Sequence, residues 1–362
     1  MFHPHKMRAA VFGAAAAAAA AGLTVAATAA QAADFSGKTI EWIIPFKAGG
    51  GSDKWSRFYA PLLSDALPGK PNVVVKNVPG GGSTQGANLF TEQAKPDGLT
   101  IFGSSGSTQF PYLLDDPRVR YEYADWNIVL GTPTGGVVYV SPKLGVNGAG
   151  DFKRLQSSRL VYGSQGATSL DLIPLLAFDM LGVNVKAVFG MKGRKDGRLA
   201  FQRGETTIDY QTTSSYLANV KPEADAGKAV ALFSWGALDA GGNLVRDPTF
   251  PDLPHFAEFY ESAHGKPPAG PAFNAWKTFF AAGFSAQKMV FLPQGTSADI
   301  IQTYSDAFAK VINAPDFADK SKKRLGVYPQ AIGAQAEVLK KQATTVDAAS
   351  KAWVQNWLKK FS

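Results

Sequence analysis

Apolar positions along the chain alternate between short continuous runs and runs with helical spacing. Residues 39–46 (TIEWIIPF) form a short apolar run rich in β-formers, and the glycine-rich segment 47–53 follows it directly. Apolar residues including Trp55, Phe58 and Leu62 then recur every three or four positions, as on one face of a helix. This part of the chain is therefore predicted to fold as a strand, a glycine loop and a helix.

The same order returns through the rest of the chain. Further strands are predicted over residues 72–76, 99–102, 137–140, 160–162, 186–189, 207–210 and 229–233. Helices are predicted over residues 83–94, 214–221, 298–311 and 334–359. A further helix is predicted after the loop at 163–169, ending at about residue 181. Residues 241–271, rich in proline, glycine and aromatics, are expected to form a long packed connection with short helical pieces. Strands that alternate with helices predict an α/β fold with helices on both faces of its sheets.

The N-terminus has the pattern of an export signal. Lys6 and Arg8 precede an alanine-rich apolar run over 11–30, and small residues stand at Ala30 and Ala32. We interpret residues 1–32 as a signal peptide cleaved near Ala32, which predicts a periplasmic protein. The alternative is a membrane-spanning helix, since the run is about long enough to cross a bilayer. No cysteine follows the run, so attachment of a lipid by the usual lipoprotein route is excluded.

Composition excludes several kinds of chemistry. The 362 residues include no cysteine and four histidines, so disulfides, thiolate metal sites and a cysteine nucleophile are ruled out. Loss of residues 1–32 removes Lys6, Arg8 and no acid, which lowers the net charge from +8 to +6. A modest positive charge attracts small anions. The basic residues are scattered, so a nucleic-acid partner is not expected.

The glycine loops do not match known catalytic or nucleotide motifs. The glycines at 49–51 and 80–82 do not form GxGxxG, and no GxSxG surrounds Ser83, Ser105 or Ser164. Backbone amides of a loop that enters a helix can hold a carboxylate or a phosphate. We expect Ser52 or Asp53 to cap the helix after the first loop. Lys47 either contacts a ligand carboxylate or is a solvated surface lysine.

Two stretches resemble a family of solute receptors. Residues 45–53 (PFKAGGGSD), with Arg57 one turn later, are similar to the PFxPGGxxD–R opening of the Bug/TctC-type receptors of tripartite tricarboxylate transporters. Residues 77–82 (NVPGGG) and 95–100 (KPDGLT) are similar to the N-x-PGxGG…PDGYTL stretch of that family. The two stretches occur in the order and at the spacing found in the family.

The resemblance implies a bilobal, type II periplasmic-binding-protein fold with two mixed-sheet lobes joined by a hinge. Lobe 1 would comprise residues 33–136 and 273–362, and lobe 2 residues 137–272. A small organic carboxylate, either a di- or tricarboxylate or an aromatic acid, would bind between the lobes. The chain would be a monomeric receptor that delivers this ligand to the membrane subunits of the transporter, with no cofactor, no metal and no enzyme activity.

The family pattern assigns ligand contacts to the loops at 47–53 and 163–169, and their neighbours are added as polar lining. The expected ligand-binding residues are Phe46, Lys47, Gly49, Gly50, Gly51, Ser52, Asp53, Ser83, Ser104, Ser105, Ser164, Gln165, Gly166, Ala167, Thr168, Ser169 and Tyr210. The second loop departs from the family, because Thr168 replaces a glycine and Leu172-Ile173 replaces His-Leu. Asp171 adds an acid, which either caps the following helix or acts on the ligand, attracting an amine or repelling a second carboxylate.

Large aromatic residues lie near predicted loops. Phe110, Tyr112, Trp235, Phe273 and Trp276 either pack in the core, as large aromatics usually do, or form a wall suited to an aromatic acid.

Two other functions stay open from the residues alone. An exported hydrolase could use a loop serine, but the only histidines after residue 32 are His255 and His264, inside the proline-rich connection. A receptor for another anion, such as phosphate or a phosphonate, would use the same kind of loop.

Overall fold

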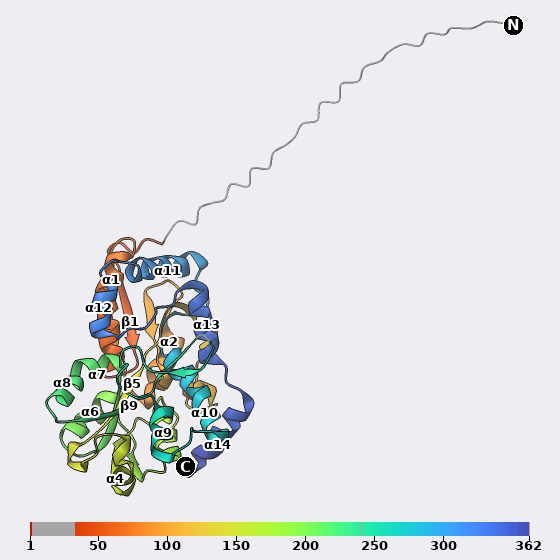
Figure 1. The fold of residues 1–362 in the computed structure, drawn as a ribbon. Coiled ribbons are helices and arrows are strands. Elements are labelled where there is room, and N and C mark those ends of the chain that lie inside the picture. The colour runs from red at the N-terminus through yellow and green to blue at the C-terminus, as the bar shows by residue number, and fades with distance from the viewer. Residues whose placement is uncertain (2–32, 240, 362) are drawn as a thin grey trace. The chain divides into compact units, whose positions relative to one another are not determined.

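The computed structural model describes residue 1 and residues 33–239 and 241–361, so the signal peptide predicted over 1–32 lies outside the described residues apart from Met1. Its largest sheet has five strands in the order β2-β1-β3-β12-β4, and β1 of this sheet is labelled in Figure 1. Their bounds are Asn72–Asn77 for β2, Thr39–Ile44 for β1, Thr100–Gly103 for β3, Lys288–Leu292 for β12 and Asn127–Thr132 for β4. Strands β1, β2 and β3 are parallel, and β12 runs antiparallel to both of its neighbours.

Helices cover both faces of this sheet, as the alternating pattern predicted. On one face, Trp42 of β1 packs against Trp55 of α1 (Gly51–Ala66) and Phe308 of α11 (Ala298–Ile312). On the other, Phe90 of α2 (Thr84–Gln93) stacks on Phe102 of β3 with ring centroids 5.1 Å apart. Helix α13 (Gly333–Thr344) covers the same sheet beside β4. The two faces are thus closed by separate apolar clusters.

The middle of the chain forms two smaller sheets. Strand β5 (Gly136–Val140) lies between β8 (Ile208–Thr212) and β9 (Val230–Ser234) in an antiparallel sheet, and β6 (Leu160–Gly163) pairs in parallel with β7 (Val185–Val188). A two-stranded hairpin, β10 (Ala237–Leu238) with β11 (Leu244–Val245), follows β9. The other helices are α3 (Gly106–Leu113), α4 (Phe152–Ser157), α5 (Leu172–Leu181), α6 (Arg194–Gln202), α7 (Thr213–Asn219), α8 (Lys221–Asp225), α9 (Phe256–His264), α10 (Gly270–Phe280), α12 (Phe317–Arg324) and α14 (Ala348–Leu358).

The C-terminal helix packs against the middle of the chain. Helices α10 and α14 contact each other (Figure 1), and α10 also contacts α5. Trp357 of α14 donates a hydrogen bond from Nε1 to Asp179 of α5 at 2.8 Å. In the part of the chain that the structure describes, no helix is long and apolar enough to cross a membrane.

Most of the predicted strands and helices lie within a few residues of observed ones, but one predicted helix is wrong and several observed elements were not predicted. The single helix predicted over 334–359 is wrong, because the chain forms α13 and α14 with a break between them. The β-branched residues Thr344, Thr345 and Val346 disfavour helix at this point. Asp347 then caps α14 by accepting a hydrogen bond from the Ser350 amide at 2.7 Å. Strands β4 and β12 and helices α3, α4, α6, α10 and α12 were not among the predicted elements.

Candidate ligand-binding site

A small, partly open cavity of about 30 Å³ lies where loops of the five-stranded sheet meet loops of the middle segment. We call it the cleft site; from the side of the five-stranded sheet it is lined by Phe46, Lys47, Gly50, Gly51, Ser52, Ser105, Ser107, Gln287 and Lys288. From the middle segment it is lined by Gln165, Leu170, Gly193, Arg194, Lys195 and Thr212. The cavity holds roughly one water molecule. The two groups of loops are therefore closed on each other.

The first glycine loop leads from β1 into α1. Gly50 is the N-cap of the helix, and neither Ser52 nor Asp53 makes a capping bond, so the expectation that one of them caps α1 is wrong. The buried Asp53 carboxylate instead accepts hydrogen bonds from the Gly49 amide at 2.7 Å and from Arg57 Nε at 2.9 Å. Gly51 must lack a side chain, because a Cβ there would lie 2.4 Å from Thr212 Oγ1. The loop thus approaches the middle segment through its backbone.

Lys288 places an unpaired cation at the cleft site. It begins β12, its side chain is buried, and its hydrogen-bond partner is Ser52 Oγ at 3.3 Å. No carboxylate of a described residue pairs with it, and burial alone lowers its pKa to about 7. A buried charge without a partner is strongly unfavourable. A negatively charged ligand in the cavity would remove that cost.

Two buried amide groups beside the cavity also lack partners. Among the described residues, nothing pairs with Nε2 of Gln165 or with Oε1 of Gln287, and both residues line the cleft site. Most buried polar atoms in folded proteins are hydrogen-bonded. Gln165 Nε2 can donate to an anionic ligand, as Lys288 can, whereas Gln287 Oε1 accepts and suits a ligand hydroxyl.

The second loop is held by a buried ion network around Arg194. Arg194 Nη1 lies 3.1 Å from Asp171 Oδ2, and Nη2 pairs with Asp209. The guanidinium also lies over the ring of Tyr210, 4.6 Å from its centroid. The Arg194 guanidinium thus has two carboxylate partners, whereas Lys288 has none among the described residues. We assign Arg194 to loop positioning.

Asp171 belongs to this network and does not cap α5 with its side chain. The carboxylate accepts hydrogen bonds from Ser164 Oγ at 3.0 Å, from the Gln165 amide at 2.6 Å and from the Tyr210 hydroxyl at 3.2 Å. Asp171 thus stands at the N-cap position of α5, as interpreted, but its side chain makes no capping bond and holds the preceding loop instead. Its bonds fix the loop that carries Gln165.

Two polar contacts join the two groups of loops at the rim. Lys47 Nζ lies 3.0 Å from Asp196, and Lys195 Nζ donates to the Ala48 carbonyl at 3.1 Å. Lys47 is therefore paired within the chain, while its side chain remains 41% exposed to solvent.

The predicted site residues fall into two groups. Those that line the cleft site are Phe46, Lys47, Gly50, Gly51, Ser52, Ser105 and Gln165. Those that lie outside its lining are Gly49, Asp53, Ser83, Ser104, Ser164, Gly166, Ala167, Thr168, Ser169 and Tyr210. Several in the second group have partners elsewhere: Ser83 donates to the Ser107 carbonyl, Ser104 pairs with Tyr123, and Thr168 donates to Asp116.

Sequence reasoning missed Lys288 and Gln287. A signal was present, because this Gln-Lys pair directly precedes the apolar run Met289 to Leu292, where a charged residue at a strand start is unexpected. Ser107, Arg194, Lys195 and Thr212 were also missed, and nothing in the local sequence marked them.

The aromatic residues pack in the core and do not line the cleft site. Phe110, Trp235 and Trp276 are fully buried in one apolar cluster, and Phe273 stacks on Trp276 with centroids 5.8 Å apart. Tyr112 donates its hydroxyl to Glu122.

Neither histidine of the described chain lies at the loop serines. His255 caps α9, where its Nδ1 accepts a hydrogen bond from the Glu258 amide. His264 stacks on Tyr260, with ring centroids 4.3 Å apart. A histidine base for a hydrolase is therefore missing beside Ser164 and Ser105 among these residues.

This fold, with loops of two sheet systems meeting at a small cavity, is that of a periplasmic binding protein. The solved structure of the periplasmic binding protein BugD matches with a TM-score of 0.65 and 20% identity, over 90% of this chain and 98% of that one. MatC from Rhodopseudomonas palustris with bound malate matches with a TM-score of 0.65 and 18% identity, over 88% and 100%. R. palustris Rpa4515 with adipate matches with a TM-score of 0.66 and 20% identity, over 90% and 98%.

Sequence comparison points the same way. A UPF0065 protein of Bordetella pertussis is 27% identical over 304 residues, which cover 82% of this chain and 83% of the relative. A UPF0065 protein of Cupriavidus necator is 26% identical over 356 residues, 95% and 97% of the two chains. No family model matches the chain. The UPF0065 proteins are the Bug family, so the resemblance to Bug/TctC-type binding proteins is confirmed in sequence and in fold.

Proposed function

We propose that this protein is a periplasmic receptor that binds a small organic carboxylate at the cleft site and delivers it to a membrane transporter. The observation that carries the proposal is the buried, unpaired ammonium group of Lys288 at the meeting point of the loops. MatC binds malate and Rpa4515 binds adipate on the same fold, which supports a carboxylate as the ligand class.

The chemistry of the cleft site suits a carboxylate. One carboxylate oxygen would accept hydrogen bonds from Lys288 Nζ and Ser52 Oγ, and the other from backbone amides at the start of α1. Gln165 Nε2 would donate to a further polar group of the ligand. These contacts neutralise the lysine and satisfy atoms that otherwise lack partners.

Capture would require the two groups of loops to separate, because a cavity of about 30 Å³ does not admit an organic acid. We assign residues 33–136 and 273–362 to one lobe and 137–272 to the other, with closure by hinge motion. The Lys47–Asp196 ion pair and the Lys195–Ala48 hydrogen bond would break on opening and reform on closure. No bond of the ligand is made or broken.

The remaining steps follow from the same proposal. Residues 1–32 direct export and are removed, and the monomeric mature protein passes its ligand to the membrane subunits of a tripartite tricarboxylate transporter.

Isothermal titration calorimetry of the mature protein against malate, adipate, benzoate and inorganic phosphate tests the proposal. We expect saturable binding of at least one carboxylate, together with a rise in melting temperature. Binding of phosphate without binding of any of the three carboxylates would instead assign the site to another anion. An esterase activity lost in a folded Ser164→Ala variant would favour the hydrolase.

A further inference from the structure

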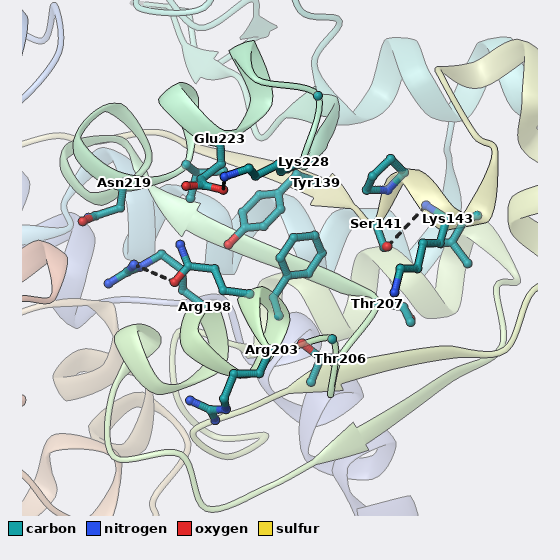
Figure 2. A pocket seen from close by; sticks show the side chains of 18 residues that line it. Tyr139, Ser141, Lys143, Arg198, Arg203, Thr206, Thr207, Asn219, Glu223 and Lys228 are labelled. Atoms are coloured by element: carbon teal, nitrogen blue, oxygen red, sulfur yellow. Dashed lines mark hydrogen bonds and ion pairs between the residues drawn. The ribbon is translucent and has the colours of Figure 1, made fainter.

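A second cavity, of about 440 Å³, lies entirely within the middle segment of the chain (Figure 2). It is enclosed by β5 and the turn after it, by α6, by the loop before β8 and by the α7–α8 region. It shares no lining residue with the cleft site. Its volume is within the range of small-molecule sites.

One wall of this cavity carries a buried cation that has no carboxylate partner among the described residues. Arg198 is 7% exposed, and its hydrogen bond goes to the neutral Gln202 Oε1 at 3.4 Å. No carboxylate of the described chain pairs with it, and its Nε has no partner there. Arg194, one turn earlier on α6, is by contrast paired with two aspartates. The structure thus supplies counter-charges for one arginine of this helix and not for the other.

Other polar groups also lie around the cavity, and among them Lys143 adds positive charge. Thr206 Oγ1 is buried and has no partner within the described residues. Arg203 and Lys228 at the rim are paired with Glu205 and Glu223, at 2.6 Å and 3.6 Å. Lys143, on the turn after β5, forms no ion pair with a described residue and lies on the opposite side of the cavity lining from Arg198 (Figure 2).

The rest of the lining is apolar. Phe201 packs edge-on against Tyr139, with ring centroids 4.8 Å apart, and Val220 and Ala229 are buried beside them. Inorganic phosphate would leave this surface unused. An anion with an apolar body would cover it while its charged group meets Arg198.

We propose that this cavity is a second ligand site, which binds a small carboxylate with an aromatic or aliphatic body. The carboxylate accepts hydrogen bonds from the Arg198 guanidinium, and the body lies against Phe201 and Val220. The site is independent of the cleft site and does not rest on the receptor function.

Crystals of the mature protein soaked with 4-bromobenzoate test the location, because bromine is found by its anomalous scattering. We expect bromine in this cavity with the carboxylate at hydrogen-bond distance from Arg198. A Lys288→Met variant removes binding at the cleft site and should keep the bromine in this cavity.

Calorimetry with the same probe on the Lys288→Met background tests the contacts in solution. Arg198→Met is expected to weaken binding roughly ten- to a hundredfold, because a charge-assisted hydrogen bond is lost. Arg120→Met, which removes an exposed arginine paired with Glu92, is the matched control and should leave binding unchanged. Neutral 4-bromobenzamide should bind much more weakly than the acid.

Three results overturn the proposal: bromine at the cleft site alone, bromine in the cavity without saturable binding in solution, or equal binding of the amide and the acid. If Arg198→Met does not fold, the bromine position in the wild-type crystal and the difference in affinity between the acid and the amide still test the proposal.

Discussion

Nζ of Lys288 lies 3.3 Å from Oγ of Ser52, and no other described residue supplies a hydrogen bond or an opposite charge to this buried ammonium group. The contact joins the start of β12 to the first turn of α1, 236 positions apart in the chain. A cation in this position weakens the folded state and strengthens the binding of an anion. The same side chain therefore links stability to function.

Replacement of Lys288 by methionine should stabilise the protein. The pKa of Lys288 is lowered from 10.5 to about 7, so between these pH values the unfolded chain binds more protons and wild-type stability rises with pH. Lys288→Met should therefore be more stable near pH 6.5, by at most roughly 5 kcal/mol, with the difference shrinking toward pH 10. Urea unfolding at pH 6.5 and 9.5 measures this, with the exposed Lys322→Met as control. A variant less stable than wild type at pH 6.5 would contradict it.

Loss of Arg194 should have the opposite effect. Arg194→Met leaves the buried carboxylates of Asp171 and Asp209 without their cation and should cost about 3–5 kcal/mol of unfolding free energy. Adding Asp171→Asn and Asp209→Asn should restore part of the loss. Arg203→Met, which breaks an exposed ion pair just after the opposite end of α6, is the control and should change little. Equal effects of the two arginine variants would show that the network does not hold the loop.

The rim ion pair should favour closure. Asp196→Asn removes the partner of Lys47 and should weaken carboxylate binding by up to about fivefold, since partly exposed pairs contribute about 0.2–1 kcal/mol. The effect should fade at high salt, because mobile ions screen the pair. Calorimetry at low and high salt checks it. Tighter binding by the variant would mean that Lys47 contacts the ligand directly and that Asp196 competes for it.

Asp247 should make stability depend on pH between 4 and 6. Burial raises the pKa of this carboxyl from 3.8 to about 6, although the Tyr328 hydroxyl donates to it at 2.8 Å. Because the folded state holds the proton more tightly, this contribution is present below pH 3.8 and is lost as the pH rises through 6. Asp247→Asn should therefore gain stability relative to wild type from pH 4 to pH 7, by up to roughly 3 kcal/mol. Melting curves at the two pH values measure it, and a constant difference would count against the assignment.

The sequence predicted what local patterns specify. The strand, glycine loop and helix from β1 to α1 follow from neighbouring residues, and the match of residues 45–53 to a family motif identified the fold. The break between α13 and α14 was missed because three β-branched residues interrupt an otherwise helical pattern only briefly.

Much of the candidate site could not be found in this way. Lys288 reaches Ser52 only because β12 inserts between β3 and β4, and this pairing is a long-range property of the sheet. The partners of Arg194 are Asp171 and Asp209, which lie far apart in sequence. Because this pairing is not visible in the local sequence, the neighbours of Asp171 alone favour a helix cap. Burial and pairing arise from packing, and short motifs do not encode them.

The affinity of the mature protein for its carboxylate ligand as a function of pH tests the central claim most directly. Lys47, Lys195 and Arg194, the other cations at the cleft site, have partners within the chain, so Lys288 should dominate the profile. Binding needs protonated Lys288, so the wild-type dissociation constant should be constant near pH 6 and rise about tenfold per pH unit above 7. Lys288→Met should bind weakly and without this rise. A wild-type profile that stays flat from pH 6 to 9, at an affinity equal to that of Lys288→Met, would show that the carboxylate does not bind at Lys288.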